Sequence, residues 1–297
     1  MKGPRVFLDY DQAELDDCYD QLAYAPNRDQ ILARFSGASE AVRSRLGAPR
    51  RLSYGPTEFE RLDLYPAQHA NAPVEIFIHG GAWRGGLAKD YAFPAELFVA
   101  AGVHFAVLDF VWIQDAADGL NTIVNQVRRA IGWLHDHARG FGGDPERLFV
   151  AGHSSGAHLA AIMLTTDWRH DFGLPTELIK GGLCASGMYD LAPVRLSARS
   201  SYVKIDDPTE QALSPQRHVE NLHAPLIVTC GSLETPEFRR HARDFARIVA
   251  EAGKPVETLL LDGYNHFEVL ETLGNPFGIL GRAALAQIGA SVPKHDR

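Results

Sequence analysis

The stretch that decides the fold lies at the middle of the chain, where residues 148–161 read LFVAGHSSGAHLAA in one-letter code. Apolar residues typical of a buried strand come first, then a turn of the form Gly-x-Ser-x-Gly centred on Ser154, then small residues that favour a helix. A strand that turns directly into a helix forces the serine into a strained backbone position at the helix N-terminus. The flanking glycines let the neighbouring elements approach closely. The pattern predicts an exposed nucleophile.

Two adjacent serines occupy this turn, and we predict different roles for them. Ser154 holds the central position and is the expected nucleophile. Ser155 would carry its hydroxyl one residue into the helix, so its backbone N–H is better placed to bind an oxyanion. The competing interpretation is a glycine-rich strand-to-helix turn without chemistry. The residues described below argue against that interpretation.

Outside this stretch, apolar runs of strand length alternate with amphipathic segments of helical period. Strands are expected at 62–65 (an edge strand), 74–78, 104–110, 148–152, 181–186, 226–230 and 256–261, and helices at 123–137, 155–164 and 237–250. This alternation predicts a mostly parallel sheet with helices on both faces. Ligands of such sheets bind beyond the carboxyl ends of the strands. The residues that follow each strand are therefore the candidates for the chemistry.

Two segments lack this alternation. Residues 1–50 have apolar side chains at helical spacing and no strand signal, which predicts a helical N-terminal cap. Residues 189–222 carry three prolines among polar and charged residues. Because a long connection in a compact domain is usually functional, we expect residues 189–222 to form a lid-like excursion over the site. Both segments belong to a single domain that spans residues 1–297.

A glycine-rich loop, HGGAW at residues 79–83, follows one of the expected strands. Acyl transfer needs backbone N–H groups that face a developing oxyanion, and glycines give a loop the backbone angles to present them. We expect Gly81 and Ala82 to donate together with Ser155. Gly80 replaces one of them if the turn is rotated.

The base is expected in the loop after the last strand, where residues 262–267 read DGYNHF. His266 in this loop can reach the nucleophile, and it needs a carboxylate on its other ring nitrogen to fix its tautomer. Glu234, just after the strand at 226–230, matches that position best. Glu237 is the alternative acid, although it is expected to begin the next helix, where a carboxylate suits the helix dipole. The chain order serine, acid, histidine is typical of enzymes whose nucleophile lies in such a strand-to-helix turn, called the nucleophile elbow.

Composition excludes several other classes of protein. The chain has 29 Lys and Arg against 37 Asp and Glu, a net charge of −8, which makes nucleic acid an unfavourable partner. Three widely spaced cysteines do not form a disulfide framework. No cluster has metal-ligand spacing, and no apolar run approaches the roughly 18 residues of a membrane helix. We therefore expect no metal, no membrane partner and a cytoplasmic location.

Together these motifs resemble those of arylformamidase (kynurenine formamidase), within the hormone-sensitive-lipase-like esterases. The resemblance is carried by His-Gly-Gly-x-Trp at 79–83, Gly-His-Ser-x-Gly-x-His at 152–158 and Gly-x-x-His-Phe at 263–267, and it covers nearly the whole chain. It implies the α/β-hydrolase fold and no cofactor. It also implies a triad, which consists of Ser154, Glu234 and His266.

The segment after the strand at 104–110 departs from the family pattern. Residues 109–114 read DFVWIQ where the family has Asp-Tyr-Arg-Leu and a proline-containing loop, which favours a substrate other than N-formylkynurenine. Trp112 lies in this segment. We expect it to form aromatic pocket walls with Phe267 and with Trp83, although Trp83 could instead pack under its loop.

The sequence thus predicts a serine hydrolase that cleaves a small ester or aryl (form)amide through an acyl-enzyme. The substrate is a small molecule, expected to be aromatic because of the aromatic residues near the strand ends. A generalist short-chain carboxylesterase is the alternative, and a non-catalytic binding protein on the same fold is a more distant one. The sequence leaves the oligomeric state open, with a homodimer as one alternative.

Overall fold

A computed structural model describes residues 2–291, so the ends of the expected domain, residue 1 and residues 292–297, lie outside the described part. Its centre is an eight-stranded sheet in the order β10-β9-β8-β7-β5-β6-β4-β3. The pairings from β10 to β6 are parallel, and β4 and β3 are added antiparallel. The strands are β3 (Arg50–Ser53), β4 (Arg61–Tyr65), β5 (Ala72–Ile78), β6 (His104–Leu108), β7 (Gly143–His153), β8 (Ile179–Ala185), β9 (Leu226–Gly231) and β10 (Val256–Leu261). The mostly parallel sheet expected from the sequence is confirmed.

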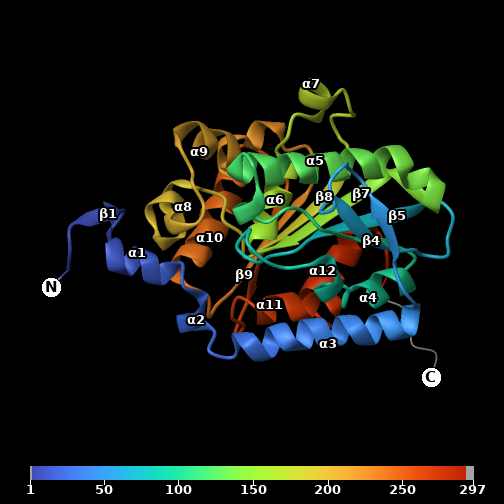
Figure 1. The fold of residues 1–297 in the computed structure, drawn as a ribbon, viewed down its shortest axis with the longest axis horizontal. Helices are drawn as coiled ribbons and strands as arrows, with labels where there is room; N and C mark the ends of the chain where they lie inside the picture. Colours follow the sequence, from blue (N-terminus) through green and yellow to red (C-terminus); the bar gives the residue numbers. More distant parts are fainter. Residues whose placement is uncertain (1, 292–297) are drawn as a thin grey trace.

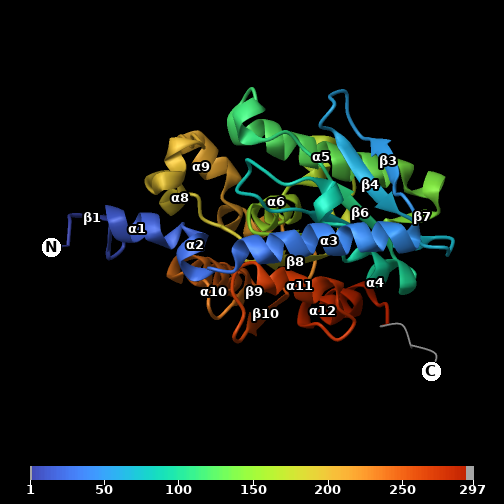
Figure 2. The ribbon, with the colours of Figure 1, turned by 60° about the horizontal axis from the view of Figure 1, so that its bottom comes forward.

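Helices cover both faces of this sheet, with α5 on one face and α3 on the other (Figures 1 and 2). The main helices are α3 (Arg28–Leu46), α4 (Ala95–Ala100), α5 (Gly119–His137), α6 (Ser155–Leu164), α10 (Pro236–Glu251), α11 (Glu268–Glu271) and α12 (Ile279–Ile288). Side chains alternate along each strand. On β5, Ile76 and Ile78 therefore enter the core under α5 and α6, whereas Phe77 enters the core under α3 and α12.

Short helices complete the chain. They are α1 (Gln12–Cys18), α2 (Gln21–Tyr24), α7 (Trp168–Phe172), α8 (Ala192–Leu196) and α9 (Asp207–Leu213), with 3₁₀ turns η1 (Ala88–Asp90), η2 (Ile113–Asp115), η3 (Ala138–Phe141), η4 (Ala198–Ser201), η5 (Pro215–Arg217), η6 (Val219–Asn221) and η7 (Thr272–Gly274). In residues 2–291 no helix has the length and apolar character needed to cross a membrane.

The N-terminal segment differs from the all-helical prediction. It holds α1, α2 and α3, but also an antiparallel pair, β1 (Arg5–Phe7) with β2 (Tyr10–Asp11), and its last residue, Arg50, begins the outermost sheet strand β3. The prediction that 62–65 forms the edge was therefore wrong, because β4 lies between β3 and β6. Three of the four residues in β3 are exposed, so its sequence lacks the alternation of apolar and polar residues from which a strand is predicted. Pairing with β4, rather than strand propensity, sets its conformation.

The excursion at 189–222 consists of α8, α9 and 3₁₀ turns without a strand. It lies beside α1 at one end of the molecule (Figure 1). Two hydrogen bonds join these segments: Gln12 Nε2 donates to the Leu196 carbonyl (2.9 Å), and the Ala198 N–H donates to Asp16 Oδ1 (2.6 Å). Segments far apart in sequence thus form one wall of the molecule.

Candidate active site

Ser154 stands at the turn between β7 and α6 in a backbone conformation that L-residues rarely adopt. Its φ is 57° and its ψ is −124°, so the elbow stores strain at this residue. The flanking glycines are needed because the elements lie very close. A Cβ on Gly152 would lie 2.3 Å from the Gly156 carbonyl oxygen, and one on Gly156 would lie 2.0 Å from the Ile78 oxygen. Any side chain at either position would push α6 away from the sheet.

The structure brings Ser154, His266 and Glu234 together at the carboxyl ends of the strands. His266 Nε2 lies 2.9 Å from Ser154 Oγ, and His266 Nδ1 lies 2.8 Å from Glu234 Oε2. The second carboxylate oxygen, Oε1, accepts from the Gly231 N–H (2.7 Å) and from Ser186 Oγ (2.5 Å). Because the carboxylate accepts a hydrogen bond from Nδ1–H, the proton of the neutral ring stays on Nδ1 and Nε2 can accept the proton of Ser154.

Neighbouring rings pack around the His266 imidazole. Phe238 and Phe267 pack edge-on against the His266 ring, with centroids 4.9 and 5.0 Å away. His153 Nε2 lies 2.7 Å from the His266 carbonyl oxygen. Burial, with the nearby His266, lowers the pKa of His153 to about 3, so His153 is neutral and donates through Nε2. The sequence signal for His153 was only its place beside the nucleophile.

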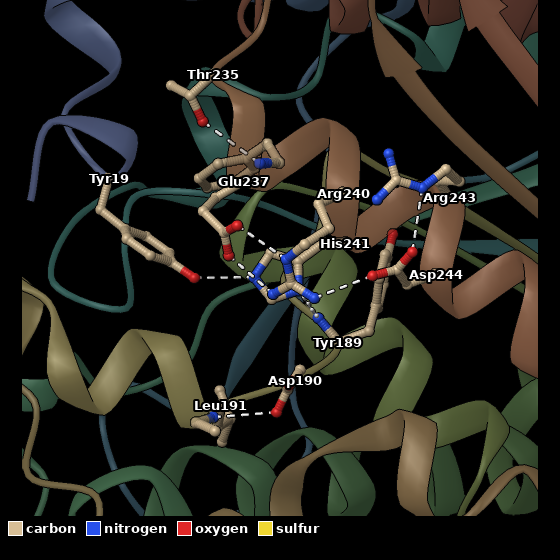
Figure 3. Close-up of polar contacts among 12 residues, drawn as sticks. Tyr19, Tyr189, Asp190, Leu191, Thr235, Glu237, Arg240, His241, Arg243 and Asp244 are labelled. Carbon is tan, nitrogen blue, oxygen red and sulfur yellow. Dashed lines mark hydrogen bonds and ion pairs between the residues drawn. The ribbon is translucent and has the colours of Figure 1, made fainter. Parts of the chain in front are cut away.

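The alternative acid, Glu237, does not contact the base. It lies in the first turn of α10, as expected, and its carboxylate accepts two bonds of 2.8 Å from Arg240 (Figure 3). Of the two candidate acids, the structure places only Glu234 against His266.

The oxyanion loop is a run of left-handed backbone. Gly81, Ala82 and Trp83 have φ values of 120°, 55° and 60°. Within residues 2–291, the backbone N–H groups of Gly81, Ala82 and Ser155 have no hydrogen-bond acceptor. These three N–H groups are therefore free of internal hydrogen bonds, and their role as oxyanion donors stays a prediction. At Gly80, the carbonyl oxygen lies 2.8 Å from His79 Nδ1, which fixes the start of the loop.

Ser155 contributes more than its backbone. Its Oγ accepts a hydrogen bond from the Trp83 N–H (3.2 Å), and both residues are almost fully buried. This bond ties the oxyanion loop to the elbow. No local pattern indicates this role for the Ser155 hydroxyl, because its partner lies 72 residues away in the chain.

A pocket of about 600 Å³ opens over Ser154 and His266. Phe267 lines it, as expected, but the prediction that Trp83 and Trp112 form its walls was wrong. The left-handed turn directs the Trp83 ring into the core, where it is 1% exposed and packs edge-on against His158. The Trp112 indole instead donates to the Gly86 carbonyl (3.0 Å).

The aromatic lining comes from other parts of the chain. Four further rings line the pocket: Tyr19 just after α1, Phe35 on α3, Tyr91 just after η1 and Tyr202 of the excursion. Sequence reasoning missed these residues because none of them follows a strand of the sheet. Within residues 2–291, no group of three or more His, Cys, Asp or Glu side chains is placed to hold a metal ion.

Comparison with known proteins places this geometry in context. The BD-FAE family model matches residues 62–180. A kynurenine formamidase from Danio rerio is 30% identical over 294 residues, which cover 91% of this chain and 96% of that protein.

Two solved structures share the architecture. A protein from Silicibacter sp. TM1040, assigned as a thioesterase, has 26% identity and a TM-score of 0.79, covering 93% of this chain and 99% of that chain. A thermophilic carboxylesterase from a metagenomic library has 20% identity and a TM-score of 0.69, covering 90% of this chain and 95% of that chain. These likenesses confirm the α/β-hydrolase fold expected from the sequence.

Proposed function

The chain belongs to the kynurenine formamidase family and is a hydrolase of ester or amide bonds, and from this premise we propose that Ser154, Glu234 and His266 release a formyl or short acyl group from an aryl amide or aryl ester. The observation that carries the proposal is the continuous hydrogen-bonded relay from Ser154 Oγ through His266 to Glu234. A nucleophile, a base and an orienting acid in this order are what acyl transfer requires.

The reaction proceeds in two steps. His266 takes the proton of Ser154 as Oγ attacks the carbonyl carbon, and the N–H groups of Gly81, Ala82 and Ser155 stabilise the oxyanion. His266 then gives that proton to the leaving amine or alcohol. Water, activated by the same imidazole, attacks the acyl-enzyme and releases the acid. In such reactions the loss of one oxyanion donor raises the barrier by roughly 3 kcal/mol.

The pocket supports an aromatic substrate. Its rings include Tyr19, Phe35, Tyr202 and Phe267, which can pack against an aryl leaving group. A homodimer and a cytoplasmic location stay predictions from the sequence.

Matched substrates test the proposal. An aryl formamide or an aryl acetate should exceed a long-chain alkyl ester in kcat/KM by at least about tenfold, or about 1.4 kcal/mol of transition-state binding. Preference for the long acyl chain would contradict the aryl substrate class and leave the Ser154 mechanism standing, whereas equal kcat/KM for aryl and short alkyl acetates would favour the generalist short-chain carboxylesterase. A fluorophosphonate probe separates both from a non-catalytic binding protein, because only an activated Ser154 forms the adduct.

A further inference from the structure

Ser186 has the same unusual backbone as the nucleophile, one strand further along the sheet. Its φ is 57°, and so is the φ of Ser154. Ser154 follows β7 and Ser186 follows β8, and these two strands are neighbours in the sheet. Each serine still continues the sheet pairing: the Ser154 N–H donates to the Ala185 carbonyl (2.9 Å), and the Ser186 N–H donates to the Thr229 carbonyl (2.8 Å). Two neighbouring strands therefore end in strained serines.

This backbone conformation is concentrated around the active site. Within residues 2–291 six residues other than glycine have a positive φ, and four of them are Ala82, Trp83, Ser154 and Ser186. The conformation is strained for any residue with a Cβ, whereas glycine adopts it freely. Ser186 thus keeps a side chain at a position where the backbone favours glycine. This indicates that the hydroxyl has a function that offsets the strain.

The Ser186 hydroxyl binds the proposed acid of the relay. Its Oγ lies 2.5 Å from Glu234 Oε1, and Ser186 is completely buried. An ionised carboxylate only accepts hydrogen bonds, so the proton in this bond belongs to the serine. A hydrogen bond to a charged acceptor is about twice as strong as one between neutral groups, and exclusion of water strengthens it further. Ser186 can therefore fix both the orientation and the charge of the carboxylate.

Glu234 has no permanent cation beside it to balance that charge. Its side chain is 0% exposed, and within residues 2–291 no Lys or Arg nitrogen lies within 4.0 Å of its carboxylate. Its hydrogen bonds come from Ser186 Oγ, from the Gly231 N–H (2.7 Å) and from His266 Nδ1 (2.8 Å). A buried charge without a cation depends on such bonds for its stability. Since Gly231 belongs to the same turn as Glu234, Ser186 is the donor that ties Oε1 to another strand.

The other ionisable groups near this relay are neutral. Burial, together with the nearby Glu234, raises the pKa of Cys230 to about 12 and holds the pKa of Tyr189 well above its usual value. His153, beside His266, is neutral as well, since its pKa is lowered to about 3. Among these neighbours only His266 can take on the positive charge that offsets Glu234. The stability of the unprotonated relay therefore depends on the hydrogen bonds to the carboxylate.

We propose that Ser186 is a positioning residue of the reaction: its hydroxyl orients the Glu234 carboxylate and stabilises the negative charge, so that Oε2 stays directed at His266 Nδ1. The relay then has four members, in the order Ser154, His266, Glu234 and Ser186, and it begins and ends at strained serines on neighbouring strands. Ser186 keeps its proton throughout, and only the protons of Ser154 and of the attacking water move to and from His266. The inference rests on the proposed function, since it adds a residue to that relay.

Two substitutions separate the hydroxyl from the backbone. Ser186→Ala removes the hydroxyl and keeps the strain, whereas Ser186→Gly removes both. With phenyl acetate as substrate, each should lower kcat by about tenfold or more, which is about 1.4 kcal/mol of barrier, and change KM by less than about twofold. Ser39→Ala is the matched control: Ser39 is a fully buried serine on α3 that accepts from the Phe93 N–H (3.0 Å), so kcat should not change. Loss of activity in the alanine variant alone would assign the effect to the backbone and overturn the proposal.

The pH profile adds a measurement that a merely structural role would not change. The unprotonated relay carries one buried negative charge, and protonation of the base offsets it. Loss of the Ser186 donor therefore destabilises the unprotonated relay more than the protonated one. In both Ser186 variants the acidic limb of kcat/KM should move to higher pH by about 0.5 unit or more, whereas Ser39→Ala should leave it in place. An unmoved limb in both Ser186 variants would overturn the proposal.

A double-mutant cycle tests whether Ser186 acts through Glu234. In the Glu234→Gln variant the charge is absent, so the further substitution Ser186→Ala should lower kcat by less than about threefold. If Ser186→Ala costs the same factor with and without the charge on Glu234, Ser186 acts elsewhere and the proposal is overturned.

The outcomes distinguish this inference from the proposed function. If the wild type cleaves phenyl acetate and both Ser186 variants keep its kcat, the role of Ser186 is overturned while the hydrolase proposal stands. If the wild type is inert towards aryl esters, aryl formamides and the fluorophosphonate probe, the proposed function fails and this inference with it. If Ser186→Ala does not fold, Ser186→Gly carries the same test, because glycine adopts this φ without strain. Wild-type kcat in the glycine variant would then overturn the proposal.

Discussion

Two regions of this molecule meet at the pocket, and they are built in opposite ways. On the sheet side, the elbow and the oxyanion loop hold the chemistry through backbone geometry, with Ser154 at a φ of 57° and glycines where no Cβ fits. On the other side, α1, α2 and the excursion form a wall whose contribution comes from side chains such as Arg199. The wall elements are short, and Leu22 on α2 is 48% exposed. The difference teaches that backbone geometry positions the groups of the sheet side, whereas side chains shape the wall; in the function that we propose, the first would set the reaction and the second the substrate.

The largest expected effect lies on the sheet side. Ser154→Ala should lower kcat by at least about a thousandfold, because the nucleophile is lost while binding remains. Ser155→Ala is the matched neighbour: it leaves the Trp83 N–H without its acceptor, and we expect about a tenfold loss. Steady-state kinetics on an aryl acetate measure both. An inactive Ser155→Ala variant together with an active Ser154→Ala variant would show that the nucleophile is Ser155 and not Ser154.

The two acids provide the next contrast. Glu234→Gln should lower kcat by about a hundredfold or more, since the tautomer of His266 is no longer fixed. Glu237→Gln should instead lower the free energy of unfolding by about 1–3 kcal/mol, because it weakens a buried pair with Arg240. Urea denaturation and kcat, measured on both variants, separate these effects. The reverse ranking would contradict the assigned roles.

A pH effect connects the two regions through His158. This ring on α6 packs against Trp83, and its Nε2 lies 2.8 Å from the Leu213 carbonyl oxygen of α9. Burial lowers its pKa from 6.5 to about 4. Below about pH 6.5 the imidazole binds a proton in the unfolded chain, whereas the folded ring stays neutral down to about pH 4. Within this window the free energy of unfolding therefore falls as the pH falls, by up to about 1.4 kcal/mol per pH unit.

His158→Gln is the corresponding test, because glutamine can still donate to Leu213 but does not titrate. The variant should lose less stability than the wild type between pH 7 and about pH 5, measured as the shift of the urea midpoint. An identical pH slope in both proteins would show that His158 is not neutral in the folded state.

The smallest expected effect concerns the aromatic lining. Phe267→Leu should lower the preference for aryl over alkyl acetates by about fivefold, near the 1 kcal/mol that one aromatic contact contributes. Phe277→Leu, at a ring that is 77% exposed and outside the pocket lining, is the control. Equal selectivity in the two variants would mean that Phe267 does not contact the substrate ring.

Sequence reasoning succeeded where a pattern is local. The strand before Ser154, the loop at 79–83 and the place of Glu237 in the first turn of α10 were all predictable from their immediate neighbours. It failed for β3, which pairing defines, and for Trp83, whose left-handed backbone turns the ring into the core. The choice between Glu234 and Glu237 stayed open in the sequence, because three residues of spacing do not show which carboxylate reaches a ring 32 residues further along the chain.

The sequence by itself determined the family, the sheet and the backbone of the reaction site. It could do so because each of these local patterns favours one local structure. Glycines allow close approach of two elements, Gly-x-Ser-x-Gly after a strand favours the strained turn, and alternating apolar residues favour a strand. Only the tertiary structure decided what the wall contains. Arg199 and Tyr19 meet across 180 residues, and a hydrogen bond of that span leaves no periodic trace in the sequence. That no carboxylate of residues 2–291 lies within 4.0 Å of the Arg199 guanidinium depends on everything packed around it, and no local sequence pattern indicates it.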